Sequence, residues 1–238
     1  MGLDWNPLAK PQPGREGEFY DLLGRVTVEK WLQPSPVQQV PLPEGLDRAA
    51  GREYRERLWR ELQAITISPY ETLDAPRVGS DAAADAWIRS KYDDAPNKPA
   101  SIDEWVQKFQ GYYVTELLPD RDGFPVYSNW PLGNWERWSF RAQFFRECED
   151  VLDSSLIDEA WLHHTASQLA DYGVRLMSWA AAYAEKEGVS WALQQRELEA
   201  ADAAEEILPV LHKAHLIASA ARWAAWWAER GHGMMADF

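Results

Sequence analysis

The chain has 238 residues, of which 46% are apolar and 26% are charged, and its formal net charge is −14. This apolar content excludes disorder as the main state of the chain. The acidic balance argues against direct binding to a nucleic-acid backbone, because a duplex binder needs a basic face that displaces phosphate counterions. Tryptophan is the most frequent aromatic residue, with 14 copies against 9 tyrosines and 7 phenylalanines.

The first half of the chain predicts short helices separated by proline-rich segments. Residues 14–26 carry enough apolar residues for a short helix, and residues 33–43, with four prolines, predict a loop. Arginine and glutamate recur over 47–64 at the i, i+3 and i+4 spacings at which side chains meet on a helix. We therefore expect a charged helix there, followed by a brief β-prone run at 65–67.

Serine residues mark the expected starts of the next helices. Ser80 predicts the N-cap of a helix over 81–92, and Ser101 with Glu104 matches a capping box for a helix that runs to Phe109. Three further segments are expected beyond them: a short strand over 112–118, a turn-rich stretch over 119–138, and a helix from Ser139 to Leu152.

The last third of the chain predicts two long helices. One pattern covers 154–187 and breaks at Gly188; a second covers 191–230 after an N-cap at Ser190. Two long helices joined by a glycine turn form an antiparallel hairpin. Pro209 is expected to kink the second helix.

These elements predict a mainly α fold, in which a long antiparallel C-terminal helical hairpin packs with an irregular, loop-rich helical N-terminal portion. At most a few short strands are expected. We expect a single compact domain over 1–238, with the irregular portion at 1–152 and the hairpin at 153–238.

Cysteine usage and targeting signals indicate the compartment. Cys148 is the only cysteine, so no internal disulfide forms, which fits a reducing compartment. The N-terminus carries no secretory signal pattern, and no uncharged apolar run is long enough to span a membrane. We expect a soluble, cytoplasmic protein without membrane attachment.

Four of the five histidines fall on the two long helices. A hairpin that turns at Gly188 would bring His163 and His164 level with His212 and His215. His212 and His215 share a helix face at i, i+3, and His164 as a third ligand would complete a divalent metal site of the Zn²⁺ or Fe/Mn type. Such a site could support hydrolysis. The alternative is that these are surface or core-edge histidines that happen to lie level.

The segment 120–141 is the second candidate site, because a loop of about 20 residues in a compact domain is usually functional or disordered. Its aromatic content argues against disorder. Aromatic rings can stack on a ligand, and arginine binds phosphate or carboxylate. The expected ligand-binding residues are Tyr127, Ser128, Asn129, Trp130, Asn134, Trp135, Arg137 and Arg141. The alternative is a structural loop with its tryptophans in the core and its arginines paired to local acids.

Trp223, Trp226 and Trp227 lie among alanines near the end of the last expected helix. They can pack inside the molecule, for example against Trp5. If they are exposed, they would form the interface of a homo-oligomer.

No G-x-G-x-x-G, G-x-x-x-x-G-K-[ST] or G-x-S-x-G motif occurs in the chain, which favours a binding protein over an enzyme. We therefore expect a soluble protein that binds a small anionic, nucleotide-like ligand through the 127–141 segment. Two alternatives remain: a metal-dependent hydrolase built on the histidines, and an acidic protein–protein interaction module.

Overall fold

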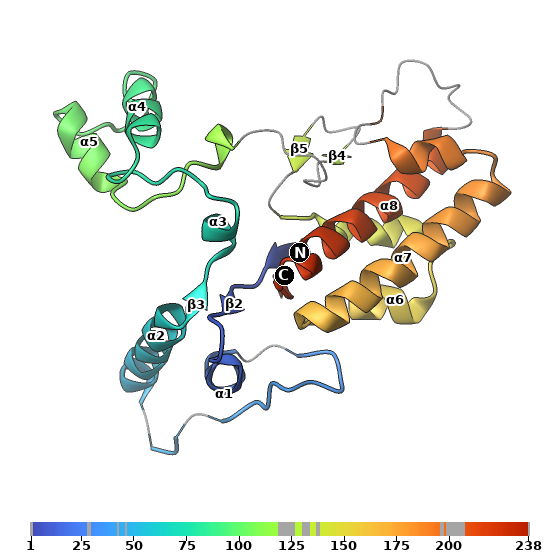
Figure 1. Ribbon diagram of the computed structural model, residues 1–238, viewed down its shortest axis with the longest axis horizontal. Coiled ribbons are helices and arrows are strands. Elements are labelled where there is room, and N and C mark those ends of the chain that lie inside the picture. The colour runs from blue at the N-terminus through green and yellow to red at the C-terminus, as the bar shows by residue number, and fades with distance from the viewer. Residues whose placement is uncertain are drawn as a thin grey trace. The chain divides into compact units, whose positions relative to one another are not determined.

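The computed structural model describes residues 2–27, 30–41, 43–45, 47–118, 127–129, 134–136, 139–195, 198 and 208–237. The helices in these ranges are α1 (Glu16–Val26), α2 (Arg48–Ala64), α3 (Pro69–Thr72), α4 (Ala82–Ser90), α5 (Ile102–Lys108), α6 (Ser154–Glu159), α7 (Ala166–Lys186) and α8 (Leu208–Glu229). Short 3₁₀ helices are η1 (Thr115–Leu117), η2 (Ala142–Cys148) and η3 (Ser190–Gln194). The prediction of a mainly α fold is confirmed (Figure 1).

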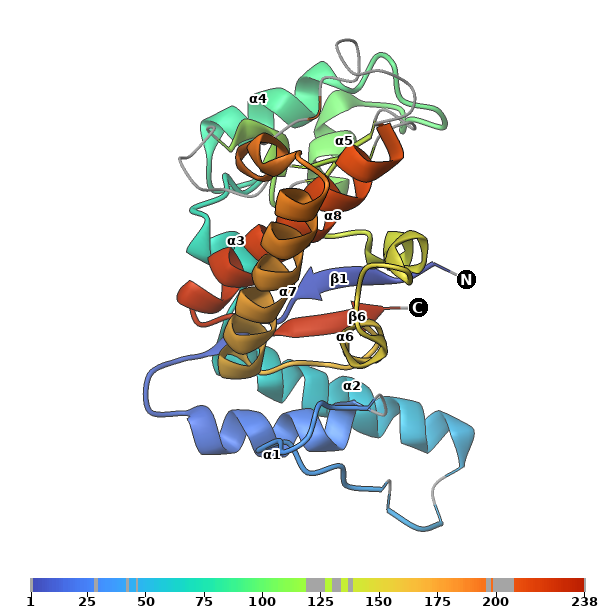
Figure 2. The same ribbon diagram turned by 90° about the vertical axis from the view of Figure 1, so that its right-hand side faces the viewer.

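Short strands form antiparallel pairs between segments that are mostly distant in the sequence. The pairs are β1 (Asp4–Pro7) with β6 (Met234–Asp237), β2 (Lys10–Pro11) with β3 (Thr66–Ile67), and β4 (Tyr127–Asn129) with β5 (Asn134–Glu136). The β1–β6 pair joins the two ends of the described chain, and Figure 2 shows these strands side by side.

The chain divides into two compact units. One combines residues 1–67 with 123–238, and the other comprises residues 68–122. Each unit has a core of its own, and the expectation of a single domain over 1–238 stays a prediction.

The predicted C-terminal hairpin is confirmed: α7 and α8 are antiparallel neighbours in the first unit (Figure 2). They approach closely at Gly173, where an added Cβ would lie 3.2 Å from the carbonyl oxygen of Ala221 and from the Cβ of Ala224. Helix α7 starts with a capping box, in which the side chains of Thr165 and Gln168 each accept a hydrogen bond from the backbone N–H of the other residue.

The ends of the hairpin helices differ from the prediction. The expected helix 154–187 is two helices, α6 and α7, and the expected start of the second helix at Ser190 is the short η3 instead. The structure describes α8 from Leu208 onward, so Pro209 lies next to the first described residue of this helix. The predicted kink at Pro209 stays a prediction.

The core of the first unit is built around Trp5, which is fully buried. Its ring lies 5.1 to 5.8 Å from the rings of Phe140, Phe145, Tyr172 and Trp223, so it joins β1, η2, α7 and α8. Its indole N–H donates to the carbonyl of Ala160 at 2.8 Å, which satisfies the polar end of the buried ring.

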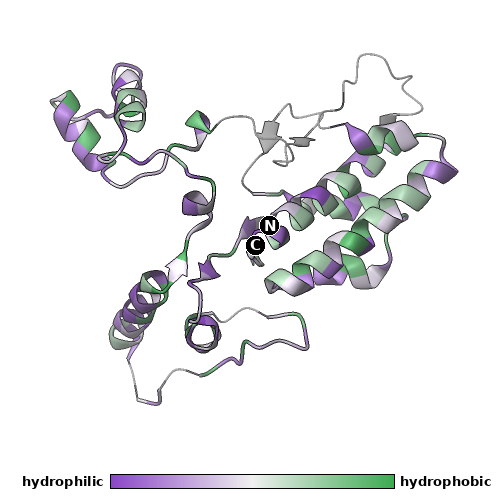
Figure 3. Cartoon of the chain, viewed as in Figure 1, coloured by the Kyte–Doolittle hydropathy of each residue, from purple (hydrophilic) through white to green (hydrophobic). Residues whose placement is uncertain are grey.

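A second cluster of the first unit holds α1 and α2 together. Both helices bury their apolar residues in it, with Trp31 and Val37 from the connection between the helices. The cluster consists of Leu8, Phe19, Leu22, Leu23, Val26, Trp31, Val37, Leu58, Leu62 and Ile65. Figure 3 shows α2 as largely hydrophilic.

The second unit packs α4 and α5 around Val78, Ile88 and Trp105. The capping bond of Ser101 to the backbone N–H of Glu104 is present, as predicted. Three predictions for residues 80–152 are corrected. The N-cap of α4 is Asp81 rather than Ser80, residues 115–117 of the expected strand 112–118 are 3₁₀ helix, and the expected helix Ser139–Leu152 is the shorter η2.

Candidate functional site

Helix α2 starts at a well-defined cap and packs by one side. The Oδ1 atom of Asp47 accepts hydrogen bonds from the backbone N–H groups of Ala49 and Ala50 at 2.9 and 2.8 Å, as an N-cap aspartate does. Leu58 and Leu62 are buried against the α1 cluster. The buried side fixes how the helix is turned, and therefore which side chains face solvent.

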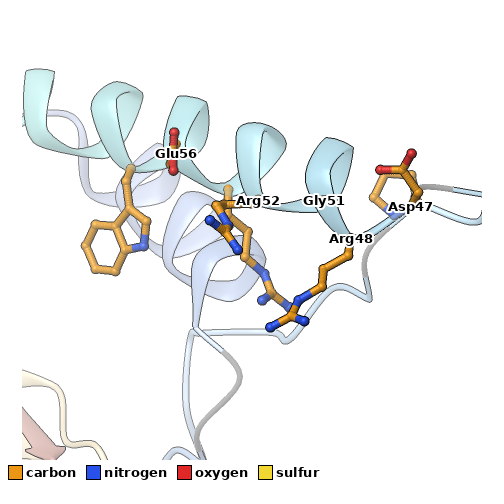
Figure 4. A pocket seen from close by; sticks show the side chains of 8 residues that line it. Asp47, Arg48, Gly51, Arg52 and Glu56 are labelled. Atoms are coloured by element: carbon orange, nitrogen blue, oxygen red, sulfur yellow. The ribbon is translucent and has the colours of Figure 1, made fainter.

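Three arginines of α2 lie on one narrow face of the helix. With about 100° of rotation per residue, Arg48, Arg52 and Arg55 fall within an arc of about 60°. Arg48 and Arg52 are exposed, and Arg55 is half-buried because it borders the packed side. Figure 4 shows Arg48 and Arg52 extending to the same side of α2. We call Arg48, Arg52 and Arg55 the arginine face.

The arginine face lines a surface hollow of about 390 Å³, to which Trp59, Asp47 and Glu56 also contribute (Figure 4). A neighbouring hollow of about 460 Å³ shares Arg48 and Arg52. Ligand pockets of proteins typically fall between about 300 and 1,000 Å³, so the space suits a small molecule.

The arginine face differs from the rest of α2 in its charge pairing. On the other side of the helix, Arg57 Nε lies 3.7 Å from Glu61 Oε1 and its guanidinium covers the ring of Tyr54. Within the described ranges, no ion pair or side-chain hydrogen bond involves Arg48, Arg52 or Arg55. The Nε atom of Arg55 is buried and has no hydrogen-bond partner there.

Unpaired guanidinium groups at this spacing carry an electrostatic cost. Arg52 lies four residues after Arg48 and three before Arg55, and like charges at such spacings each destabilise a helix by about 0.2–0.5 kcal/mol. A guanidinium offers N–H donors in a fixed fork that matches carboxylate and phosphate oxygens. The arrangement can therefore bind an anion, and binding would relieve the repulsion.

The sequence prediction did not identify this site. The regular recurrence of arginine and glutamate over 47–64 suggested surface charges that meet at i, i+3 and i+4 spacing. Glu56 does lie four residues after Arg52, yet no ion pair joins the two within the described chain. The signal that would have found the site is angular: the three arginines and Trp59 all fall within the same arc of about 60°.

The predicted ligand-binding loop is described only in part. Tyr127, Ser128 and Asn129 form β4, and Asn134 and Trp135 belong to β5. The register pairs Ser128 with Trp135, and nothing is described of the side chains of these residues.

The remaining residues of the predicted loop site are Trp130, Arg137 and Arg141. Trp130 and Arg137 lie outside the described residues. Arg141 is the N-cap residue of η2, and its Nε lies 3.1 Å from Asp4 Oδ1. An anion at Arg141 would therefore compete with an existing carboxylate partner.

The structure does not bring the three predicted metal ligands together. His164 precedes α7 and pairs through its backbone with Met234 of β6, whereas His215 lies near η3 at the other end of the hairpin. The separation along α7 is roughly 25 Å. The physical reason is the connection: Gly188 is followed by η3 rather than by the second long helix, and Gly173 of α7 lies level with Ala221 and Ala224 of α8, so a tight turn at Gly188 does not set the register.

The hydrogen-bond partners of these histidines also indicate packed residues rather than metal ligands. His164 Nε2 lies 2.9 Å from the carbonyl oxygen of Glu159 and therefore carries the proton. His212 Nε2 lies 3.4 Å from Glu147 Oε2, and His215 Nε2 lies 3.4 Å from Ser219 Oγ. Among the residues that the structure describes, no three His, Cys, Asp or Glu side chains are grouped to hold a metal ion.

The C-terminal tryptophans pack inside the first unit. Trp223, Trp226 and Trp227 have exposed fractions of 1%, 6% and 0%, and Trp223 contacts Trp5. The guanidinium of Arg230 covers the ring of Trp226 at 3.6 Å. The three rings are therefore not an exposed patch, and an oligomer through them, which required exposure, lacks its basis.

Cys148 is buried, and burial raises the pKa of its thiol to about 12. The thiolate that a nucleophile or a metal ligand requires is therefore disfavoured at neutral pH.

Comparisons with known proteins add no relative from which a function could be transferred: no family model, no curated protein and no solved structure matches the chain. None of the described helices is both long and apolar enough to cross a membrane.

Proposed function

We propose that the protein binds a small anionic ligand, without catalysing its conversion, at the arginine face of α2. One observation carries the proposal: Arg48, Arg52 and Arg55 line a common hollow and have no acidic partner in the described chain. The whole chain has 38 acidic residues against 24 basic ones, so acidic partners for arginine are abundant. Three neighbouring arginines left without one are better explained by an external anion than by the need for a soluble surface.

The proposal keeps the ligand class expected from the sequence and moves the site from the 127–141 segment to α2. A cytoplasmic location is part of the proposal and is supported by the single, buried cysteine.

The test is a thermal unfolding series with inorganic phosphate and pyrophosphate, at an ionic strength held constant with sodium chloride. A ligand that binds only the folded state raises the apparent Tm in proportion to its occupancy. We expect pyrophosphate to raise the Tm of the full chain more than phosphate does, because it can contact more of the three arginines at once.

The variants Arg52→Gln and Arg55→Gln should lower the pyrophosphate affinity about tenfold each, the equivalent of one charge-assisted hydrogen bond. Arg57→Gln is the matched control, because it removes the same charge from the other side of the same helix. If all three variants lost the same pyrophosphate affinity, the losses would reflect net charge alone and would contradict the proposed site. A Tm increase with pyrophosphate no larger than that with sodium chloride at the same ionic strength would contradict it as well.

A further inference from the structure

Trp59 is the one aromatic side chain that lines the hollow of the arginine face, and it has no aromatic or cationic partner among the described residues. It lies four residues after Arg55, in the same arc of α2 as the three arginines. Its exposed fraction is 38%, whereas the tryptophans of the core, such as Trp5 and Trp223, are at 1% or below. Part of its side chain is therefore accessible to a ligand.

The position of the indole relative to the arginines follows from helix geometry. Side chains on a helix lean toward its N-terminus, so Trp59 covers the turn that carries Arg55. The arginines then continue in one direction, from Arg55 through Arg52 to Arg48, over about 10 Å of helix axis. A flat platform at one end of a row of positive charges is complementary to a molecule with a ring at one end and several anionic groups in line.

Asp47 limits this row at its N-terminal end. Its carboxylate accepts from the backbone N–H groups of Ala49 and Ala50, so those two groups are already satisfied and do not compete with the arginine side chains for an anion. The negative charge of Asp47 also opposes any anion that extends beyond Arg48. This arrangement favours a short anionic chain over a long polyanion.

We infer that the ligand of the arginine face is a nucleoside polyphosphate, with its base stacked on Trp59 and its phosphates along Arg55, Arg52 and Arg48. The inference rests on the proposed function. It adds that the protein recognises a base as well as phosphate groups. Stacking of a base on an aromatic side chain corresponds to about a tenfold gain in affinity.

The test compares two probes, adenosine triphosphate and inorganic tripolyphosphate, by calorimetric titration into the full chain without divalent metal. We expect the nucleotide to bind about tenfold more tightly than tripolyphosphate. Trp59→Leu should bring the ratio of the two affinities close to one, and Trp59→Tyr, which keeps a ring, should restore part of it. Trp191→Leu is the matched control, because Trp191 is an exposed tryptophan on η3 that does not line the hollow.

The outcomes separate this inference from the proposed function. Equal affinities for the two probes, with both lowered by Arg52→Gln, would overturn base recognition and leave anion binding in place. Loss of the ratio in Trp191→Leu but not in Trp59→Leu would also overturn the inference. Failure of both probes to bind would overturn the proposed function together with it.

Discussion

At the scale of single residues, burial determines the charge of the histidines. His164, His215 and His232 have exposed fractions of 0% to 1%. Burial lowers the pKa of His215 to about 3, with Arg222 and His212 adding to the effect, and it lowers that of His232 to about 4. These side chains are therefore neutral in the folded protein at pH 7.

The first prediction is that the free energy of unfolding decreases as the pH falls from 7 to 5. In that range the unfolded chain binds protons at His215 and His232, with a pKa near 6.5, whereas the folded chain does not. Each of the two histidines should remove about 2 kcal/mol between pH 7 and pH 5, and the loss from His215 should stop growing near pH 3. Chemical denaturation at a series of pH values measures this decrease in the free energy of unfolding.

The variant His215→Gln isolates one of these protons. It should be less stable than the parent at pH 7, because a packed side chain is changed, but its stability should depend less steeply on pH between 7 and 5. A slope identical to that of the parent would show that His215 is protonated in the folded state.

At the scale of elements, Gln168 performs two tasks at the start of α7. Its Oε1 accepts from the backbone N–H of Thr165 at 2.9 Å, which is half of the capping box. Its Nε2 donates to the carbonyl oxygens of Leu32 and Pro34 at 2.8 and 2.7 Å. One side chain thus fixes the helix end and also ties it to the segment that follows α1.

The second prediction separates these tasks by substitution. Gln168→Glu keeps the acceptor of the capping box but loses both donors and sets a carboxylate against two carbonyl oxygens, which should cost about 1–3 kcal/mol of folding stability. Gln168→Ala loses both tasks without adding a charge. If Gln168→Glu were as stable as the parent in urea unfolding, the bonds to Leu32 and Pro34 would contribute nothing.

Capping and periodicity were sufficient to predict most elements but not their ends. Ser101 was correctly placed as an N-cap because the capping motif is local. The expected helix over 191–230 began too early, because residues 190–194 form the short η3 instead, and helix propensity alone does not show where a helix starts. That error in register carried over to the predicted metal site, which depended on a turn at Gly188.

The arginine face was missed for a different reason. The sequence shows that Arg52 and Glu56 are four residues apart, but not whether they pair. The pairing depends on rotamers and on the neighbouring packing, and only the structure shows that Arg57 pairs with Glu61 while Arg52 stays apart from Glu56. The anionic class of the ligand is inferred from residues 127–141, and we propose the arginine face of α2 as its site instead.

At the scale of the whole molecule, the arginine face is a local exception to an acidic chain. The net charge of −14 repels large polyanions. At physiological ionic strength, charges more than about 8 Å apart are largely screened, so a small anion experiences mainly the charges that line the hollow, which are three arginines against Asp47 and Glu56.

The third prediction follows from this difference in size. A 20-base-pair DNA duplex should show no measurable binding in fluorescence anisotropy at about 0.15 M salt, the condition at which pyrophosphate is tested. Micromolar duplex affinity that weakens steeply with added salt would contradict the prediction. It would also indicate a longer basic surface than α2 provides.

The most direct measurement of the central claim is the side-chain Nε–H NMR spectrum of the arginines during a pyrophosphate titration, with each signal assigned by substitution. Binding at the arginine face predicts that the signals of Arg48, Arg52 and Arg55 shift together and saturate at the same ligand concentration, while that of Arg57 stays in place. Shifts confined to Arg137 and Arg141 would instead locate the anion at the 127–141 segment, and unchanged signals throughout would show that the protein binds no such anion.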